Sequence, residues 1–199
     1  MFIKLKLLYP ICDPMTRKLL LGTLIAITFV LSMIMVPAFA GGHLTITSSD
    51  VKINPSKLKA DITTAAPIPL GGTSGAFGYA ILTDGGTGPL DNVLVLVTHL
   101  PIDDSSHEDP ASGFHTHVLD LMTPSAGCAG HDLEVDLAGS GANAAFDADY
   151  NWKIKGTKAK IRAVPVSDLG GATTVIGVTS FTVTPIFAGP TLTNLCVDV

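Results

Sequence analysis

Apolar and β-branched residues recur along the chain in short runs, and clusters containing Gly, Pro, Asn and Asp separate these runs. Short runs of this kind, several of them alternating apolar with polar residues, are typical of β-strands bounded by turns. The pattern predicts seven to nine strands, at residues 43–47, 76–82, 92–100, 114–122, 131–137, 146–154, 158–166, 173–185 and 195–199. Residues 54–75 are rich in Pro, Gly and Thr, which favours a loop or an irregular edge. The spacing predicts an all-β fold, an antiparallel β-sandwich or Greek-key barrel.

The run at residues 92–100 differs from the others because Val and Leu occupy it almost continuously. A strand without polar alternation is suited to burial on both of its faces. The polar, acidic segment 101–113 follows directly, and we expect it to form an exposed loop.

The first 40 residues have the pattern of a secretory signal peptide. Arg17 and Lys18 precede an apolar run at residues 19–36, and Ala38-Phe39-Ala40 provides a small-x-small cleavage site. We expect cleavage after Ala40, with Met15 as a possible true start. The alternative is an uncleaved membrane anchor, because the apolar run is just long enough to span a bilayer. Either reading places residues 41–199 outside the cytoplasm, as a single secreted or cell-envelope domain.

Charge is unevenly divided between this leader and the rest of the chain. Residues 41–199 contain eight Lys and Arg against sixteen Asp and Glu. Such an acidic balance would repel phosphate backbones, so it argues against nucleic acid as a partner. The one basic stretch contains Lys153, Lys155, Lys158, Lys160 and Arg162. The pattern favours a solvated strand face there, with an acidic partner or lipid head groups as the alternative.

Cys128 and Cys196 are the two cysteines that remain beyond the leader. In an exported chain two cysteines favour one disulfide, because the compartment is oxidising. Two unpaired buried thiols are the alternative.

Histidines cluster in the middle of the chain, where five of the six fall between residues 99 and 131. His115 and His117 are two positions apart on an expected strand, so their side chains point to the same face, about 6.6 Å apart at Cα. Two imidazoles at this spacing can converge on one ion, and imidazole nitrogen suits zinc and copper. His131 is a candidate third ligand, whereas His99 is either a fourth ligand or a plain strand end. The alternative is that these histidines have no ligand role.

The segment Gly113-Phe114-His115-Thr116-His117 resembles the Cu/Zn superoxide dismutase family, which carries Gly-Phe-His-x-His at a strand end. The resemblance implies a dismutase-like sandwich in which both histidines bind copper. It also implies that Cys128 bonds to Cys196 and that His131 bridges copper and zinc.

Other parts of the family pattern are missing from this chain. No histidine follows His131, and Thr191-Leu192-Thr193-Asn194 stands where the family has an arginine that guides the anion. We therefore expect an exported copper- or zinc-binding protein with an incomplete dismutase-like site, used for metal storage, delivery or sequestration. One alternative is an active superoxide dismutase, with His99 or an open position completing the site. The other is a non-catalytic structural or adhesion domain of the cell envelope. The sequence leaves the oligomeric state open.

Overall fold

A computed structural model describes residues 41–71, 74–99, 109 and 112–199. The expected signal peptide, its cleavage site and the possible anchor at residues 19–36 lie outside the described residues, as does most of the acidic loop. Within the described residues, no helix is long and apolar enough to cross a membrane.

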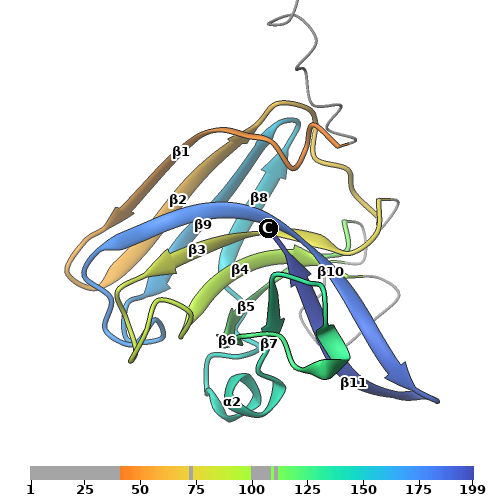
Figure 1. The fold of residues 1–199 in the computed structure, drawn as a ribbon. Coiled ribbons are helices and arrows are strands. Elements are labelled where there is room, and N and C mark those ends of the chain that lie inside the picture. Colours follow the sequence, from red (N-terminus) through yellow and green to blue (C-terminus); the bar gives the residue numbers. More distant parts are fainter. Residues whose placement is uncertain (1–40, 72–73, 100–108, 110–111) are drawn as a thin grey trace, which may run out of the picture. The chain divides into compact units, whose positions relative to one another are not determined.

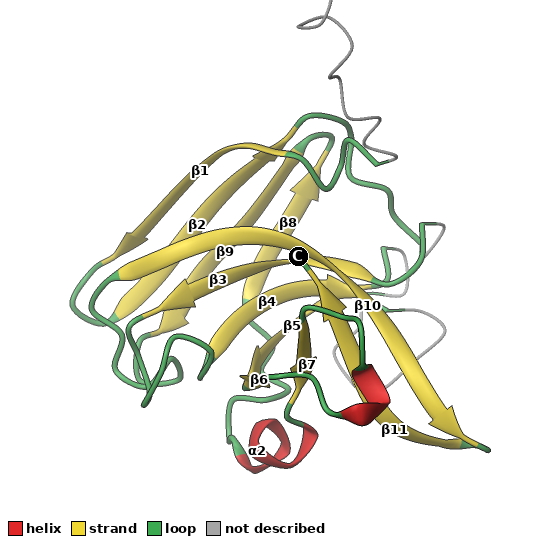
Figure 2. Ribbon diagram, viewed as in Figure 1, coloured by secondary structure: helices red, strands yellow, loops and turns green. Residues whose placement is uncertain are grey.

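Two antiparallel sheets make up almost all of the fold (Figures 1 and 2). The four-stranded sheet has the order β1 (Ile46–Ile53), β2 (Lys57–Thr64), β9 (Lys158–Pro165) and β8 (Asn151–Lys155). The seven-stranded sheet has the order β5 (Phe114–Leu119), β4 (Val93–Thr98), β3 (Phe77–Thr83), β10 (Val175–Ala188), β11 (Thr191–Asp198), β7 (Leu133–Val135) and β6 (Leu121–Met122). The prediction of an all-β antiparallel sandwich is confirmed.

The seven-stranded sheet is curled. Its two outermost strands, β5 and β6, are consecutive in the chain and are separated by the single residue Asp120. The two edges of the sheet must therefore approach each other, which gives the sheet a convex and a concave face (Figure 2).

The apolar residues form one cluster on each side of this curled sheet. The larger cluster fills the space between the two sheets and includes Phe77, Tyr79 and Phe114. The smaller cluster lies on the concave side and includes Val95 and Phe181. Because β4 contributes to both clusters, all six of its residues are buried. Burial of this strand on both faces, predicted from its continuous Val/Leu sequence, is confirmed.

The prediction of a loop or irregular edge across residues 54–75 is wrong in its first part. Residues Lys57–Thr64 form β2, which pairs with β1 on one side and β9 on the other. Leu58, Ala60 and Ile62 alternate with polar residues and are buried, which is the period-2 pattern of a strand with one face in water. The small apolar set and the nearby prolines obscured this alternation.

Two short helical elements also interrupt the strands. A 3-10 turn at Ala126–Cys128 precedes β7, and the α-helix α2 (Leu137–Ala142) follows it. The Asp136 side chain caps α2 by accepting hydrogen bonds from the backbone N–H groups of Ala138 and Gly139. The sequence predicts a strand over residues 131–137, but β7 spans only Leu133–Val135 because α2 begins at Leu137.

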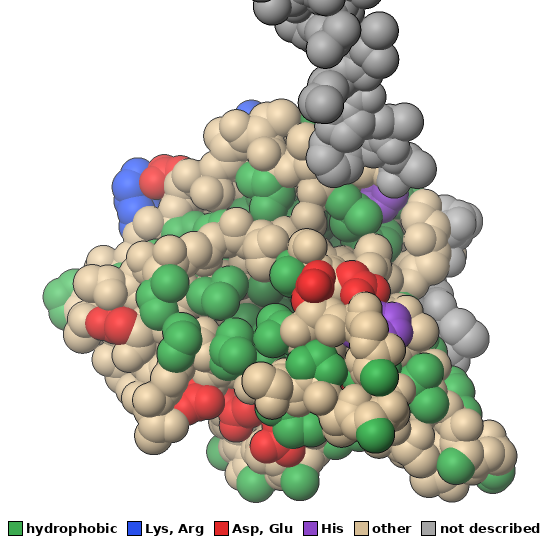
Figure 3. All heavy atoms as spheres, viewed as in Figure 1, with side chains coloured by type: hydrophobic (Ala, Val, Ile, Leu, Met, Phe, Trp, Pro, Cys, Tyr) green, Lys and Arg blue, Asp and Glu red, His purple; other side chains and the backbone are tan. Residues whose placement is uncertain are grey.

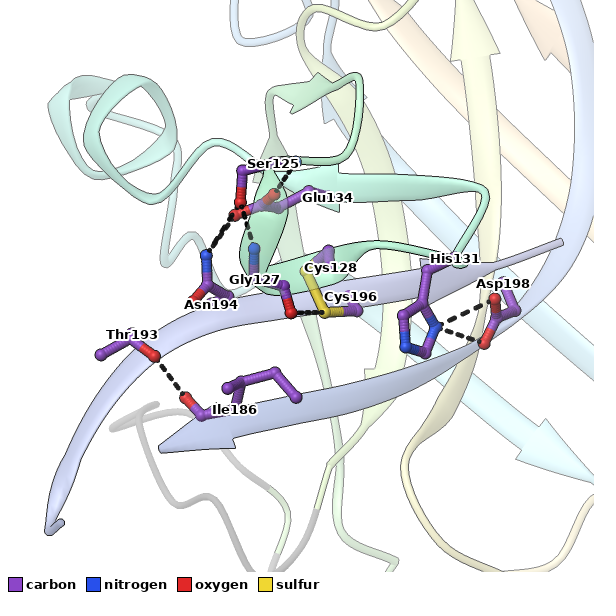
Figure 4. The surroundings of a disulfide bond; sticks show 10 residues. All are labelled: Ser125, Gly127, Cys128, His131, Glu134, Ile186, Thr193, Asn194, Cys196 and Asp198. Carbon is purple, nitrogen blue, oxygen red and sulfur yellow. Dashed lines mark hydrogen bonds and ion pairs between the residues drawn. A yellow bond between two sulfur atoms is a disulfide. The ribbon is translucent and has the colours of Figure 1, made fainter. Parts of the chain in front are cut away.

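A disulfide between Cys128 and Cys196 joins the 3-10 turn to β11, as the sequence predicts (Figure 4). Both cysteines are fully buried. The bond closes a loop of 68 residues, and loop entropy of that size contributes about 4 kcal/mol to stability.

Glu134 is a buried carboxylate beside this disulfide (Figure 4). It accepts a hydrogen bond from the Asn194 side-chain amide and another from the Ser125 backbone N–H, each at 2.7 Å. These bonds favour the ionised carboxylate, so they lower the pKa of Glu134. The charged form therefore holds the 3-10 turn against β11.

We expect this carboxylate to contribute to the acid sensitivity of the fold. A carboxylate with a lowered folded-state pKa stabilises the protein above its unfolded pKa of about 4.3, and the contribution is lost as the pH falls through the folded value. Melting temperatures of Glu134→Gln should therefore fall less steeply over this acidic range than those of the unaltered protein. Asp50→Asn, which removes an exposed carboxylate from the other sheet, is the charge-matched control. If the melting temperatures of Glu134→Gln and of the unaltered protein fell equally with pH, this role would be contradicted.

Candidate metal centre

Three buried histidines converge on the concave side of the seven-stranded sheet. His115 and His117 belong to β5, and His99 comes directly after β4 ends at Thr98. Their exposed fractions are 0%, 3% and 7%. One ring nitrogen from each lies within 4.8 Å of the others, so this trio could hold a metal ion.

Strand register explains why the three side chains meet. His115 pairs with Val97 and His117 pairs with Val95 across the β5–β4 ladder. Side chains alternate along a strand, so His99 shares its face with Val95 and Val97. These valines belong to the concave cluster, whereas Phe114 and Val118 belong to the core between the sheets. The three histidines therefore belong to the concave face.

The three rings contact one another closely. The Nε2 atoms of His115 and His117 are 2.8 Å apart, and the two ring planes are nearly perpendicular at 88°. The ring of His99 lies edge-on to His115 at a centroid distance of 4.5 Å and nearly parallel to His117 at 5.9 Å. The expected convergence of His115 and His117 is present, and His99 completes the trio.

The other nitrogen of His117 determines how this ring is oriented. Its Nδ1 is 2.8 Å from the carbonyl oxygen of Phe146, and the Phe146 ring stacks on the imidazole at a centroid distance of 4.9 Å. A carbonyl can only accept, so Nδ1 carries the proton and the lone pair is on Nε2, facing His115. Metal-binding histidines commonly have this arrangement, in which a backbone carbonyl fixes the tautomer.

A metal ion would require a small rearrangement of the pair. Zinc binds histidine nitrogen at about 2.0–2.1 Å in tetrahedral geometry, which separates two ligand nitrogens by about 3.3 Å. The 2.8 Å between the two Nε2 atoms is shorter and corresponds to a hydrogen bond. The two rings would thus move apart by about half an ångström to admit an ion. Three histidines leave one tetrahedral position for a further ligand.

An apolar cavity of about 310 Å³ adjoins the trio on the concave side. Aliphatic side chains of β3, β4, β10 and β11 line it, together with Phe146, His99 and His117. No lining side chain carries a carboxylate, an ammonium or a guanidinium group. Figure 3 shows hydrophobic side chains gathered in the middle of one face of the molecule. The histidine trio thus shares a wall with a cavity whose lining is mostly apolar.

His131, expected from the sequence as the third ligand, is not a member of the trio. Its Nδ1 lies 3.0 Å from a carboxylate oxygen of Asp198, at the end of β11 (Figure 4). The turn through Cys128 directs this histidine toward β11. Sequence reasoning left His99 open between a ligand and a strand end. The signal that identifies His99 as a member of the trio is its alternation with Val95 and Val97. These valines pair with His117 and His115 on the neighbouring antiparallel strand, so all three histidines share one face.

His43 and His107 do not enter the trio either. The ring of His43 packs edge-on against Phe77 at a centroid distance of 4.6 Å, and burial lowers its pKa. His107 lies outside the described residues.

No family model matches the chain, and no curated protein or solved structure matches it either. The resemblance to Cu/Zn superoxide dismutases stays a prediction.

The hydrogen-bond pattern predicts different tautomers for the two β5 histidines in metal-free protein. His117 should be protonated at Nδ1, because this atom faces the Phe146 carbonyl. Since His117 Nε2 then accepts, His115 should be protonated at Nε2. Long-range ¹⁵N–¹H correlation spectra of the imidazoles would identify both tautomers. A protonated Nε2 on His117 would contradict the geometry.

Proposed function

We propose that this protein is an exported metal-binding protein that holds one copper or zinc ion with His99, His115 and His117. The observation that supports the proposal is the convergence of three buried imidazoles, with ring nitrogens within 4.8 Å of one another. Imidazole is a ligand that suits both ions. An oxidising compartment, which the disulfide and the leader favour, accords with export.

Burial of the ligands favours retention of the ion over rapid exchange. None of the three histidines is more than 7% exposed, so chelators in solution would have little direct access to the ligand atoms. Storage or sequestration accords with this arrangement better than fast delivery does.

The charge of the cavity supports metal holding over dismutase activity. Superoxide is an anion, and positive charge around a site is what draws an anion in. The cavity beside the histidines is lined by no lysine or arginine, and the only arginine beyond the leader, Arg162, belongs to β9 in the other sheet. A copper-loaded centre here would lack electrostatic guidance of its substrate.

Metal titration of the purified protein tests the proposal. We expect one equivalent of zinc or copper to bind and to raise the melting temperature, because a ligand that binds only the folded state stabilises it. Each of His99→Gln, His115→Gln and His117→Gln should weaken binding by at least about a hundredfold, since loss of an outer-sphere partner alone costs tenfold to a hundredfold.

His131→Gln is the matched control for this titration, because the same substitution is made outside the trio. It should leave affinity and stoichiometry unchanged. Circular dichroism of each metal-free variant separates loss of a ligand from loss of the fold. Stoichiometric binding that His99→Gln leaves intact would contradict the trio, and no stoichiometric binding at all would contradict the function.

A further inference from the structure

Every lysine and arginine after residue 40 belongs to the four-stranded sheet. These eight residues are Lys52 on β1, Lys57 and Lys59 on β2, Lys153 and Lys155 on β8, and Lys158, Lys160 and Arg162 on β9. The seven-stranded sheet contains none of them, although it is the larger sheet.

The eight cations also share one face of that sheet, which we call the cationic face. On β2 and β9 they alternate with Leu58, Ala60, Ala159 and Ile161, which are buried in the core between the sheets. On β8 the intervening Trp152 and Ile154 pack against the same core. Because alternate residues of a strand point to opposite sides, the cations all point away from the core.

The register brings like charges directly opposite one another on the cationic face. Lys52 pairs with Lys59, Lys153 with Lys160, and Lys155 with Lys158. Opposed like charges on neighbouring strands destabilise a sheet. Three such pairs in a four-stranded sheet are therefore a cost to folding that a bound anionic surface would offset.

Two carboxylates, those of Asp50 and Asp61, belong to the same four strands. Both carboxylate oxygens of Asp61, on β2, accept hydrogen bonds from Nη2 of Arg162 at 2.8 Å. One of them also lies 3.1 Å from Nζ of Lys160. Asp50 pairs with Lys52 at 2.7 Å. Lys57, Lys59, Lys153, Lys155 and Lys158 make no ion pair within the described residues, so cations outnumber their carboxylate partners on the four strands.

The rest of the domain has the opposite sign. The other acidic residues after residue 40 lie outside the four strands, with no basic residue among them. On the face shown in Figure 3, Lys and Arg appear only along the margin beside β1, whereas most of the Asp and Glu lie elsewhere. A net charge taken over the whole domain conceals this separation.

We propose that the cationic face is a docking surface for an anionic lipid membrane. The face is a sheet, so its charges form an array spaced by about 4.8 Å between strands and about 7 Å along them. Such a broad array matches a plane of head groups, and basic residues are drawn to anionic leaflets in this way. This inference does not depend on the metal centre, which is on the other sheet.

The composition of the face favours lipid over nucleic acid. Seven of the eight cations are lysines, which act as point charges without the planar fork that arginine uses for bidentate phosphate recognition. Single-stranded nucleic acids also need aromatic side chains on which bases stack. The one tryptophan of the sheet, Trp152, packs against the core instead.

Vesicle co-sedimentation tests the proposal directly. The protein should bind vesicles made of equal parts phosphatidylglycerol and phosphatidylcholine, beyond any binding to pure phosphatidylcholine. This difference should disappear at about 1 M salt, where the Debye length is about 3 Å. Comparison between the two vesicle types removes the apolar contribution of the leader. Its basic residues, Arg17 and Lys18 among them, also favour anionic vesicles, and the comparison between variants removes their contribution because every variant carries the same leader.

Lys153→Gln/Lys160→Gln is the informative variant, because these residues face each other and the substitution removes two charges. Its affinity for the anionic vesicles should fall about 25-fold, at about fivefold per lysine. Its melting temperature should change little, because relief of the repulsion between the two lysines offsets loss of the exposed Lys160–Asp61 ion pair, and Asp61 keeps its hydrogen bonds from Arg162. The weaker binding could then not be attributed to unfolding.

Thr184→Glu/Thr191→Glu is the matched control, since it makes the same change in net charge at exposed positions of β10 and β11. It should bind nearly as well as the unaltered protein, and Lys153→Arg/Lys160→Arg should retain full binding. Equal losses in the glutamine variant and the control would overturn the proposal, because net charge alone would then explain them. Binding to heparin or duplex DNA without binding to the anionic vesicles would also overturn it.

Discussion

The antiparallel pairing of β4 with β5 is the interaction on which the rest of the domain depends. β4 is buried on both faces, so its side chains complete the core between the sheets and the apolar cluster of the concave side at once. The same ladder fixes His115 opposite Val97 and His117 opposite Val95. A slip by one residue would turn both histidines into the sandwich core and Phe114 out of it. Core packing therefore holds the histidine trio in place.

The curl of the seven-stranded sheet shields the face that bears the histidines from water. A flat sheet would leave the face that bears the histidines open to water. Because β5 and β6 are consecutive in the chain, the sheet must bend until its edges approach. The bend brings together the aliphatic side chains that line the cavity, and Phe146, from the segment between α2 and β8, stacks on His117. The disulfide and the Glu134 hydrogen bonds hold the 3-10 turn to β11, in the part of the sheet that closes this curl.

Much of the fold could be read from the sequence because burial imposes a period of two on the strands. The continuous Val/Leu run marked β4, and the His-x-His spacing marked two members of the trio. The choice between His99 and His131 could not be made in the same way. The position of His99 depends on which strand pairs with β5, and the position of His131 depends on the direction of the turn after Cys128. The local spacing of residues encodes neither of these. β2 was missed because its buried apolar residues are few and lie in a segment whose Pro, Gly and Thr content favours a loop.

The domain separates its two kinds of chemistry between its two sheets. Histidine and aliphatic side chains occupy the concave side of the curled sheet, and every lysine and arginine after residue 40 lies on the outer face of the other sheet. Anomalous diffraction from zinc-soaked crystals would locate an ion bound by the histidine trio. We expect one anomalous peak enclosed by the ring nitrogens of His99, His115 and His117. A peak at His131 and Asp198 instead, or none near the trio, would contradict this expectation.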